Sequence, residues 1–249
     1  MQIFSMKFIF PFLLIVFYVM SCGNMAESQE VEDADQIKPI ITLTGSLNNQ
    51  TRSYKSKISV LLKNKDNDPI EIKGGMVKVN GYTMTPPNTA LIGSSGNMDY
   101  VFYGDIVPDE LYEFEIILSN NQTYKAWIES PEVFPTILEV PQRVERNKSL
   151  EVKWQNSDYR YPQFLLIKNY VTDKGFSEEG QVQLEIKNPF YGSYTIDKKY
   201  VKYQNVSEEQ INETRIILLA QTEGTLDEYF SRKGTITCTY KLYTDVEVY

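Results

Sequence analysis

The C-terminal stretch of the chain, residues 235–248, alternates between two kinds of side chain. Successive side chains of a β-strand point to opposite faces of the sheet, so this pattern predicts a long final strand with one face in a core. Cys238 then points inward and behaves as a small hydrophobic residue. The positions between carry mostly threonine or charge. The apolar positions are Ile236, Cys238, Tyr240, Leu242, Val246 and Val248.

A second clear alternation lies in the middle of the chain. Tyr112, Phe114, Ile116 and Leu118 fall on one face, the turn residues 120–121 interrupt the run, and the alternation resumes after them. This predicts a hairpin with one buried face. Shorter strands are predicted at 58–62 and 77–79, and the second of these precedes Asn80-Gly81, a strong hairpin-turn signal.

Two prolines, Pro131 and Pro135, separate these strands from a second set. Prolines this close are not tolerated in a central strand, so we place a domain boundary between residues 131 and 132. Later strands are predicted at 150–155, 164–167, 182–186 and 216–220. The continuous apolar runs at 164–167 and 216–220 are typical of central strands in a packed sheet. We therefore expect an all-β chain with two tandem β-sandwiches, residues 37–131 and residues 132–249.

The second half resembles fibronectin type III and related immunoglobulin-like domains found in surface lipoproteins. The resemblance covers Glu132 to Tyr249 and implies an immunoglobulin-like sandwich with a core tryptophan, although the paired cysteines of antibody domains are absent. The first half resembles a more divergent module of the same class. The residues that carry the resemblance are Pro135, Val140-Pro141, Leu150-Glu151-Val152-Lys153-Trp154, Gly192-Ser193-Tyr194-Thr195-Ile196, Gly224-Thr225-Leu226-Asp227 and Gly234-Thr235-Ile236.

The N-terminus carries an apolar leader from Phe8 to Met20, with Lys7 before it and Ser21-Cys22-Gly23 after it. About 13 apolar residues are too few for a membrane-spanning helix, which needs about 20. A cysteine in this setting resembles the lipobox of bacterial lipoproteins, whose leader is cleaved before an acylated cysteine. The resemblance implies a signal peptide over residues 1–21, with translation starting at Met1 or Met6, and a membrane anchor at Cys22. The alternative is an ordinary secretory signal with an incidental cysteine.

Residues 22–36 follow the leader and are rich in acids without a basic residue. We expect a flexible tether, because so few apolar side chains cannot offset the entropy lost on ordering. Acidic tethers at this place also resemble the signals that send lipoproteins of Bacteroidota to the outer cell surface. A plain solvated spacer is the alternative.

Composition excludes several classes of function. The chain has no histidine, which removes histidine-dependent catalytic triads and histidine-liganded metal sites. Its net charge is −8 and no long basic stretch is present, so nucleic acid is not an expected partner. The second cysteine, Cys238, has no partner in the chain if Cys22 is acylated, and no cofactor is indicated.

Three groups of residues are candidates for a site. Asp66, Asn67 and Asp68 offer oxygen atoms to calcium, but the spacing of a calcium loop is missing, and a solvated turn is the preferred interpretation. Asp105, Asp109 and Glu110 could form the carboxylate pair that glycoside hydrolysis requires, but acids in loops are common in an acidic chain. The third group consists of aromatic residues in or near polar loops of the second half, suited to sugars or protein interfaces. These are Tyr159, Tyr161, Phe190, Tyr191 and Tyr194.

Together these features predict a lipoprotein of the cell envelope, on the surface or the periplasmic face of the outer membrane. We expect it to be a non-catalytic module that binds a glycan or an envelope protein. A structural spacer without a ligand site is the alternative. An enzyme that uses Asp105 or Asp109 is the third and least favoured interpretation.

Overall fold

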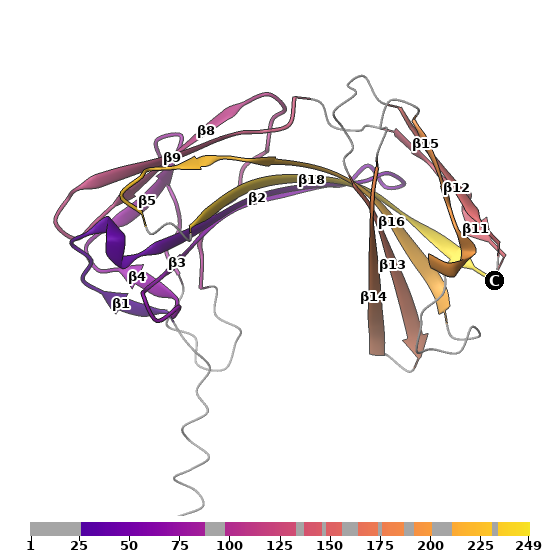
Figure 1. Ribbon diagram of the computed structural model, residues 1–249, viewed down its shortest axis with the longest axis horizontal. Coiled ribbons are helices and arrows are strands. Elements are labelled where there is room, and N and C mark those ends of the chain that lie inside the picture. The colour runs from indigo at the N-terminus through magenta and orange to yellow at the C-terminus, as the bar shows by residue number, and fades with distance from the viewer. Residues whose placement is uncertain are drawn as a thin grey trace, which may run out of the picture.

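A computed structural model shows an arch built almost entirely from β-strands (Figure 1). The structure describes residues 26–87, 98–132, 137–145, 148–155, 164–173, 176–186, 192–200, 211–230 and 234–249. Among these residues there is no α-helix, only two single turns of 3-10 helix, η1 (Ala34–Gln36) and η3 (Lys198–Tyr200). The all-β class with sandwich-like packing of sheets, predicted from alternation, is confirmed.

One large sheet runs through the whole arch. Its strands lie in the order β14-β13-β16-β18-β2-β3-β7, and β11 pairs with the end of β18. The strands are β2 (Lys38–Asn48), β3 (Tyr54–Lys63), β7 (Tyr100–Phe102), β11 (Arg143–Val144), β13 (Phe164–Asp173), β14 (Phe176–Glu185), β16 (Ile211–Glu223) and β18 (Thr235–Val248).

Two smaller sheets cover the large sheet, one on each leg of the arch. The first has the order β17-β9-β8-β5-β6 and the second the order β10-β12-β15. A two-stranded parallel pair, β1 with β4, lies at the base of the first leg. The strands are β1 (Glu27–Gln29), β4 (Ile70–Ile72), β5 (Met76–Val79), β6 (Tyr82–Thr83), β8 (Leu111–Ile117), β9 (Thr123–Glu129), β10 (Ile137–Glu139), β12 (Leu150–Gln155), β15 (Ser193–Ile196) and β17 (Thr225–Leu226).

The local predictions for the first leg are confirmed. Phe114, Ile116 and Leu118 are fully buried, and β8 pairs with β9 as a hairpin. Asn80 and Gly81 both have positive φ and form the two-residue turn between β5 and β6. A two-residue turn with positive φ at both positions matches the twist of the flanking strands, and asparagine and glycine adopt positive φ most readily. This explains why Asn80-Gly81 predicts the turn.

The C-terminal strand contributes to both cores. The inward side chains of β18 up to Tyr240 lie in the first core, which includes Phe114, and Leu242, Val246 and Val248 lie in the second, which includes Trp154. The strand pairs antiparallel with β16 along most of its length and parallel with β2 from Thr235 to Tyr243. The division into residues 37–131 and 132–249 did not anticipate this pairing and stays a prediction.

Gly45 leaves room for two aromatic side chains on the core face of β2. A Cβ at this position would lie 2.9 Å from the ring of Tyr240 and 2.9 Å from the hydroxyl of Tyr54. The two rings stack over the glycine with their centroids 6.2 Å apart. The glycine therefore leaves the space in which aromatic side chains from β3 and β18 meet.

The prediction of a flexible tether over residues 22–36 is wrong from Ala26 onward. Val31 and Ala34 are fully buried in the first core, and the Val31 N–H donates a hydrogen bond of 2.9 Å to Ser119 Oγ. β1 pairs with β4 in the same stretch. The acidic side chains of this segment are exposed, whereas Val31 and Ala34 pack in the core. The acidic composition therefore gave no sign that the segment contributes to packing.

Candidate functional site

Most of the predicted site residues lie outside the part of the chain that the structure describes. This holds for the predicted signal peptide, for Cys22 and for four of the five aromatic candidates, Tyr159, Tyr161, Phe190 and Tyr191. The fifth, Tyr194, lies in β15 opposite Val152, half-buried against the second core. Its ring therefore helps to pack the sandwich, and the aromatic cluster as a whole stays a prediction.

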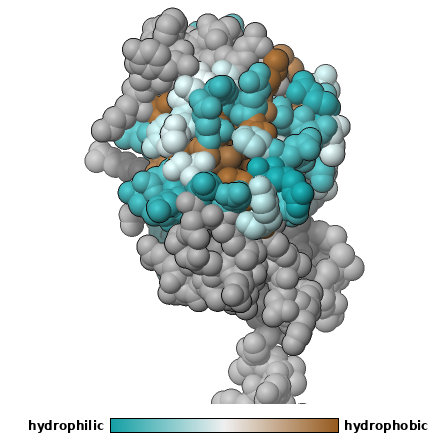
Figure 2. Space-filling model, turned by 90° about the vertical axis from the view of Figure 1, so that its right-hand side faces the viewer, coloured by the Kyte–Doolittle hydropathy of each residue, from teal (hydrophilic) through white to brown (hydrophobic). Residues whose placement is uncertain are grey.

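The end of the arch that carries Tyr194 is mostly polar on its outer surface. Glu151 and Lys153 of β12 and Ser193 and Thr195 of β15 are exposed. Figure 2 shows this side: hydrophilic side chains cover most of the coloured surface and border a narrow apolar strip at its centre. A strip this narrow is ordinary for a soluble sandwich and does not mark a binding site.

Each of the two groups of acids in the first half lies in a hydrogen-bonded loop. Asn64 Oδ1 accepts hydrogen bonds from the N–H groups of Asp66 and Asp68, and Asn67 has a positive φ, so this segment is a self-capped turn. In the second group, the carboxylate of Glu110 accepts hydrogen bonds from the Tyr112 hydroxyl and from Asn80 Nδ2. Among the described residues, no group of His, Cys, Asp or Glu could hold a metal ion.

Cys238 is fully buried in the first core, as the alternation predicted. Burial raises the pKa of its thiol to about 12, because the apolar surroundings penalise the thiolate. The residue therefore packs as a hydrophobic side chain and is not a reactive thiol.

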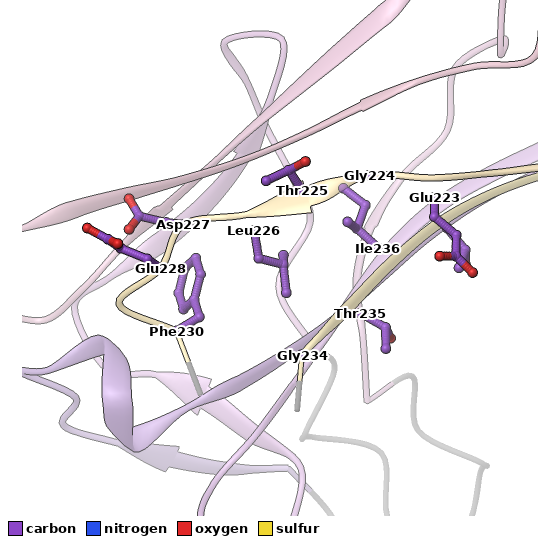
Figure 3. A pocket seen from close by; sticks show the side chains of 11 residues that line it. Glu223, Gly224, Thr225, Leu226, Asp227, Glu228, Phe230, Gly234, Thr235 and Ile236 are labelled. Carbon is purple, nitrogen blue, oxygen red and sulfur yellow. The ribbon is translucent and has the colours of Figure 1, made fainter. Parts of the chain in front are cut away.

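A pocket of about 420 Å³ lies where the chain crosses from the large sheet to the sheet that covers it (Figure 3). After Glu223, the chain leaves β16, forms β17 against β9, turns, and returns to the large sheet as β18. Gly224 stands at the crossing: its N–H donates to the Ile236 carbonyl at 3.1 Å, and a Cβ there would collide with the Trp127 carbonyl oxygen. The crossing thus requires a glycine. The pocket lies between the segment that leaves the large sheet, residues 223–230, and the start of β18, residues 234–237.

Charged and hydroxyl side chains surround an apolar floor in this pocket. In Figure 3, Leu226, Phe230 and Ile236 lie between Asp227 and Glu228 at one end and Glu223 at the other. The hydroxyls come from three threonines: Thr225 of β17 and Thr235 and Thr237 of β18.

The turn after β17 is held by its own side chains. Asp227 Oδ1 accepts a hydrogen bond of 3.2 Å from the Tyr229 N–H, and the Asp227 N–H donates to the Lys125 carbonyl at 2.9 Å. Phe230 is buried and packs against Tyr124, with ring centroids 5.7 Å apart. Asp227 is therefore engaged in local structure, whereas Glu223 and Glu228 are exposed and available to a ligand.

The chemistry of the pocket suits a polyhydroxylated ligand. Carboxylates accept hydrogen bonds from hydroxyl groups, threonine hydroxyls both donate and accept, and apolar side chains accommodate C–H surface. The volume falls within the roughly 300–1,000 Å³ of small-molecule sites. The sequence prediction missed these residues. Gly224-Thr225 and Gly234-Thr235 entered the sequence analysis only through the resemblance to fibronectin type III domains. No pattern in the neighbouring residues indicates that the chain changes sheets between them.

No helix in the described ranges is long and apolar enough to cross a membrane. No protein-family model, curated protein or solved structure matches the chain. Function is therefore inferred from the sequence, the fold and the pocket.

Proposed function

We propose that the protein is a lipoprotein of the bacterial cell envelope, anchored through acylated Cys22, whose β-sandwich fold serves as a non-catalytic glycan-binding module. The pocket beside β17 is the observation that carries the proposal. Its exposed Glu223 and Glu228 and its three threonines offer hydrogen-bonding groups around a small apolar floor, which is the pattern that a sugar requires.

The anchor and the module have separate roles in this proposal. A lipoprotein cysteine carries more than one acyl chain, and two chains are enough for stable attachment. The absence of histidine from the sequence favours binding over acid–base catalysis, since histidine is the commonest general base. The location is the outer membrane, on its surface or its periplasmic face.

The experiment is a binding screen of the full chain, purified in detergent, against immobilised neutral, amino and acidic glycans. We expect at least one glycan to bind, and Glu223→Ala with Glu228→Ala to weaken that binding about a hundredfold or more, because hydrogen bonds to charged groups contribute about 1.5–3 kcal/mol each. The matched control is Glu139→Ala with Glu151→Ala, which removes the same charge from the exposed faces of β10 and β12.

A screen in which no glycan binds would contradict this proposal. It would favour the alternative of a structural spacer, for which the continuous β18 provides a physical basis, because one strand stiffens both legs of the arch. Equal weakening in the pocket variant and in the control would also contradict the site, since it would show a general effect of charge.

A further inference from the structure

The inner face of the arch is a second surface with a chemistry of its own. The two larger cores lie on one face of the large sheet, and a small buried cluster of Leu166, Ile217 and Leu219 lies on the opposite face, on β13 and β16. On β2, β3 and β18 this opposite face points into the arch, and its side chains are partly or fully exposed (Figure 1). Its principal residues, which we call the Thr–Lys surface, are Thr42, Thr44, Lys55, Thr237, Thr239 and Lys241.

The strand register arranges these side chains in rows. Thr42 pairs with Thr237 and Thr44 with Thr239, so four hydroxyls form a two-by-two block on adjacent strands. Neighbouring strands are about 4.8 Å apart, and residues on one face of a strand repeat about every 6.7 Å. The block is therefore a regular array of hydroxyl groups.

The next row brings two lysines to the same face. Ser46 of β2 pairs with Lys241 on one side and with Lys55 on the other, so the two lysines flank it about 10 Å apart. No carboxylate in the described part of the chain forms an ion pair with either of them. In a protein with a net charge of −8, Lys55 and Lys241 give this row a local positive charge, and the exposed Glu223 of β16 lies beside Thr237 at the edge of the surface.

The surroundings of Lys241 show that its charge is poorly compensated. Burial of the side chain, together with the positive charge of Lys168, lowers the pKa of Lys241. Farther along the same face, Asp245 is already bound by Arg215, whose Nε donates to Asp245 Oδ1 at 2.6 Å and whose Nη2 donates to Oδ2 at 3.1 Å. An anion from outside the chain is the group that would stabilise the ammonium of Lys241.

We propose that the Thr–Lys surface binds an acidic polysaccharide, whose carboxylate or sulfate groups contact Lys55 and Lys241 and whose hydroxyls meet the threonine array. The inference rests on the proposed glycan-binding function and names the class of glycan. Its surface adjoins the pocket, because Thr237 borders both and pairs with Glu223 of β16. The four aligned threonines favour a sugar chain over an acidic peptide, because they match repeated hydroxyl groups. The small number of cationic groups disfavours nucleic acid, which is bound mainly through many phosphate contacts.

The test uses the full chain in detergent and four probes: polygalacturonate, neutral dextran, poly-glutamate and single-stranded DNA. Polygalacturonate is expected to bind, and its affinity should fall as salt is added, since salt screens exposed charges. Lys55→Gln with Lys241→Gln should weaken this binding about tenfold, the size expected for two charge contacts at the surface, one exposed and one half-buried. The matched control, Lys125→Gln with Lys153→Gln, makes the same change of net charge on the outer faces of β9 and β12 and should bind like the wild type.

The outcomes separate this inference from the proposed function. Absence of binding to polygalacturonate, or equal loss in both lysine variants, would overturn the acidic-glycan surface, while a neutral or amino sugar bound at the pocket would leave the proposed function intact. Stronger binding to poly-glutamate or to DNA than to polygalacturonate would also overturn it. Unchanged thermal unfolding of Lys55→Gln with Lys241→Gln is the check that lost binding is not lost folding.

Discussion

The Tyr112 hydroxyl accepts a hydrogen bond of 2.8 Å from the Val107 N–H, five residues earlier in the chain. The same hydroxyl contacts the Asp105 carbonyl and the Glu110 carboxylate, at 3.4 and 3.3 Å. Tyr112 lies at the start of β8 and closes the loop between β7 and β8. This hydrogen bonding resembles the tyrosine corner that is found in β-sandwiches, where a tyrosine hydroxyl bonds to the backbone a few residues upstream.

Tyr112→Phe should destabilise the protein by about 1–2 kcal/mol, because it removes the acceptor of the part-buried Val107 N–H. Urea denaturation followed by fluorescence measures the change. Tyr82→Phe is the control, since the Tyr82 side chain is mainly exposed, and its effect should stay within about 0.5 kcal/mol. Equal stability of the two variants would show that the corner has no energetic role.

Much of the fold could be predicted from the sequence where the pattern is local. The alternation around Phe114 identifies a strand and its buried face, and Asn80-Gly81 identifies a turn, because each depends on neighbouring residues alone. The parallel pairing of Thr235–Tyr243 with β2 has no local signal, since its partner lies almost two hundred residues earlier. The pocket escaped prediction for the same reason: it exists because the chain changes sheets at Gly224.

The N-terminal segment provides a second prediction. Val31→Ala should cost about 1–3 kcal/mol, because it removes two methyl groups from a fully buried site and leaves a cavity. Glu32→Ala, at the next position and exposed, should cost no more than about 0.5 kcal/mol. If residues 26–36 were a free tether, both variants would unfold at the same urea concentration as the wild type.

Alkaline pH should destabilise the protein through its buried acids. Burial raises the pKa of Cys238, Tyr100, Tyr112 and Tyr240 to about 12, from ordinary values of 9.0 for the thiol and 10.0 for the phenols. The unfolded chain releases these protons once the pH passes 9–10, whereas the folded chain keeps them until about 12. Unfolding therefore releases protons in this window, and the free energy of unfolding falls as the pH rises.

Thermal unfolding between pH 8 and pH 11 tests this sign. The midpoint should be nearly constant up to about pH 9 and then fall. Tyr240→Phe removes one of the four groups and should make the fall less steep, relative to the same variant at pH 8. A midpoint that rises with pH, or that is flat to pH 11, would mean that these groups lose their protons as readily in the folded protein as in the unfolded chain.

The anchor is tested by Cys22→Ser in the full chain. The variant should move from the membrane fraction to the soluble fraction, because it has no thiol to acylate. Cys238→Ser is the matched control and should stay with the membrane, since its buried thiol takes no part in anchoring. Unchanged membrane association of Cys22→Ser would contradict the lipoprotein assignment.

The central claim is that the pocket beside β17 holds a sugar. Its most direct test is a titration of the isotope-labelled chain with the best glycan from the screen, followed through the backbone amide signals. The account predicts saturable chemical-shift changes at the amides of Gly224, Thr225 and Gly234, which border the pocket. The changes should be smaller in the variant that carries Glu223→Ala and Glu228→Ala. Absence of shifts at these three residues, with a bound glycan perturbing amides elsewhere, would contradict it.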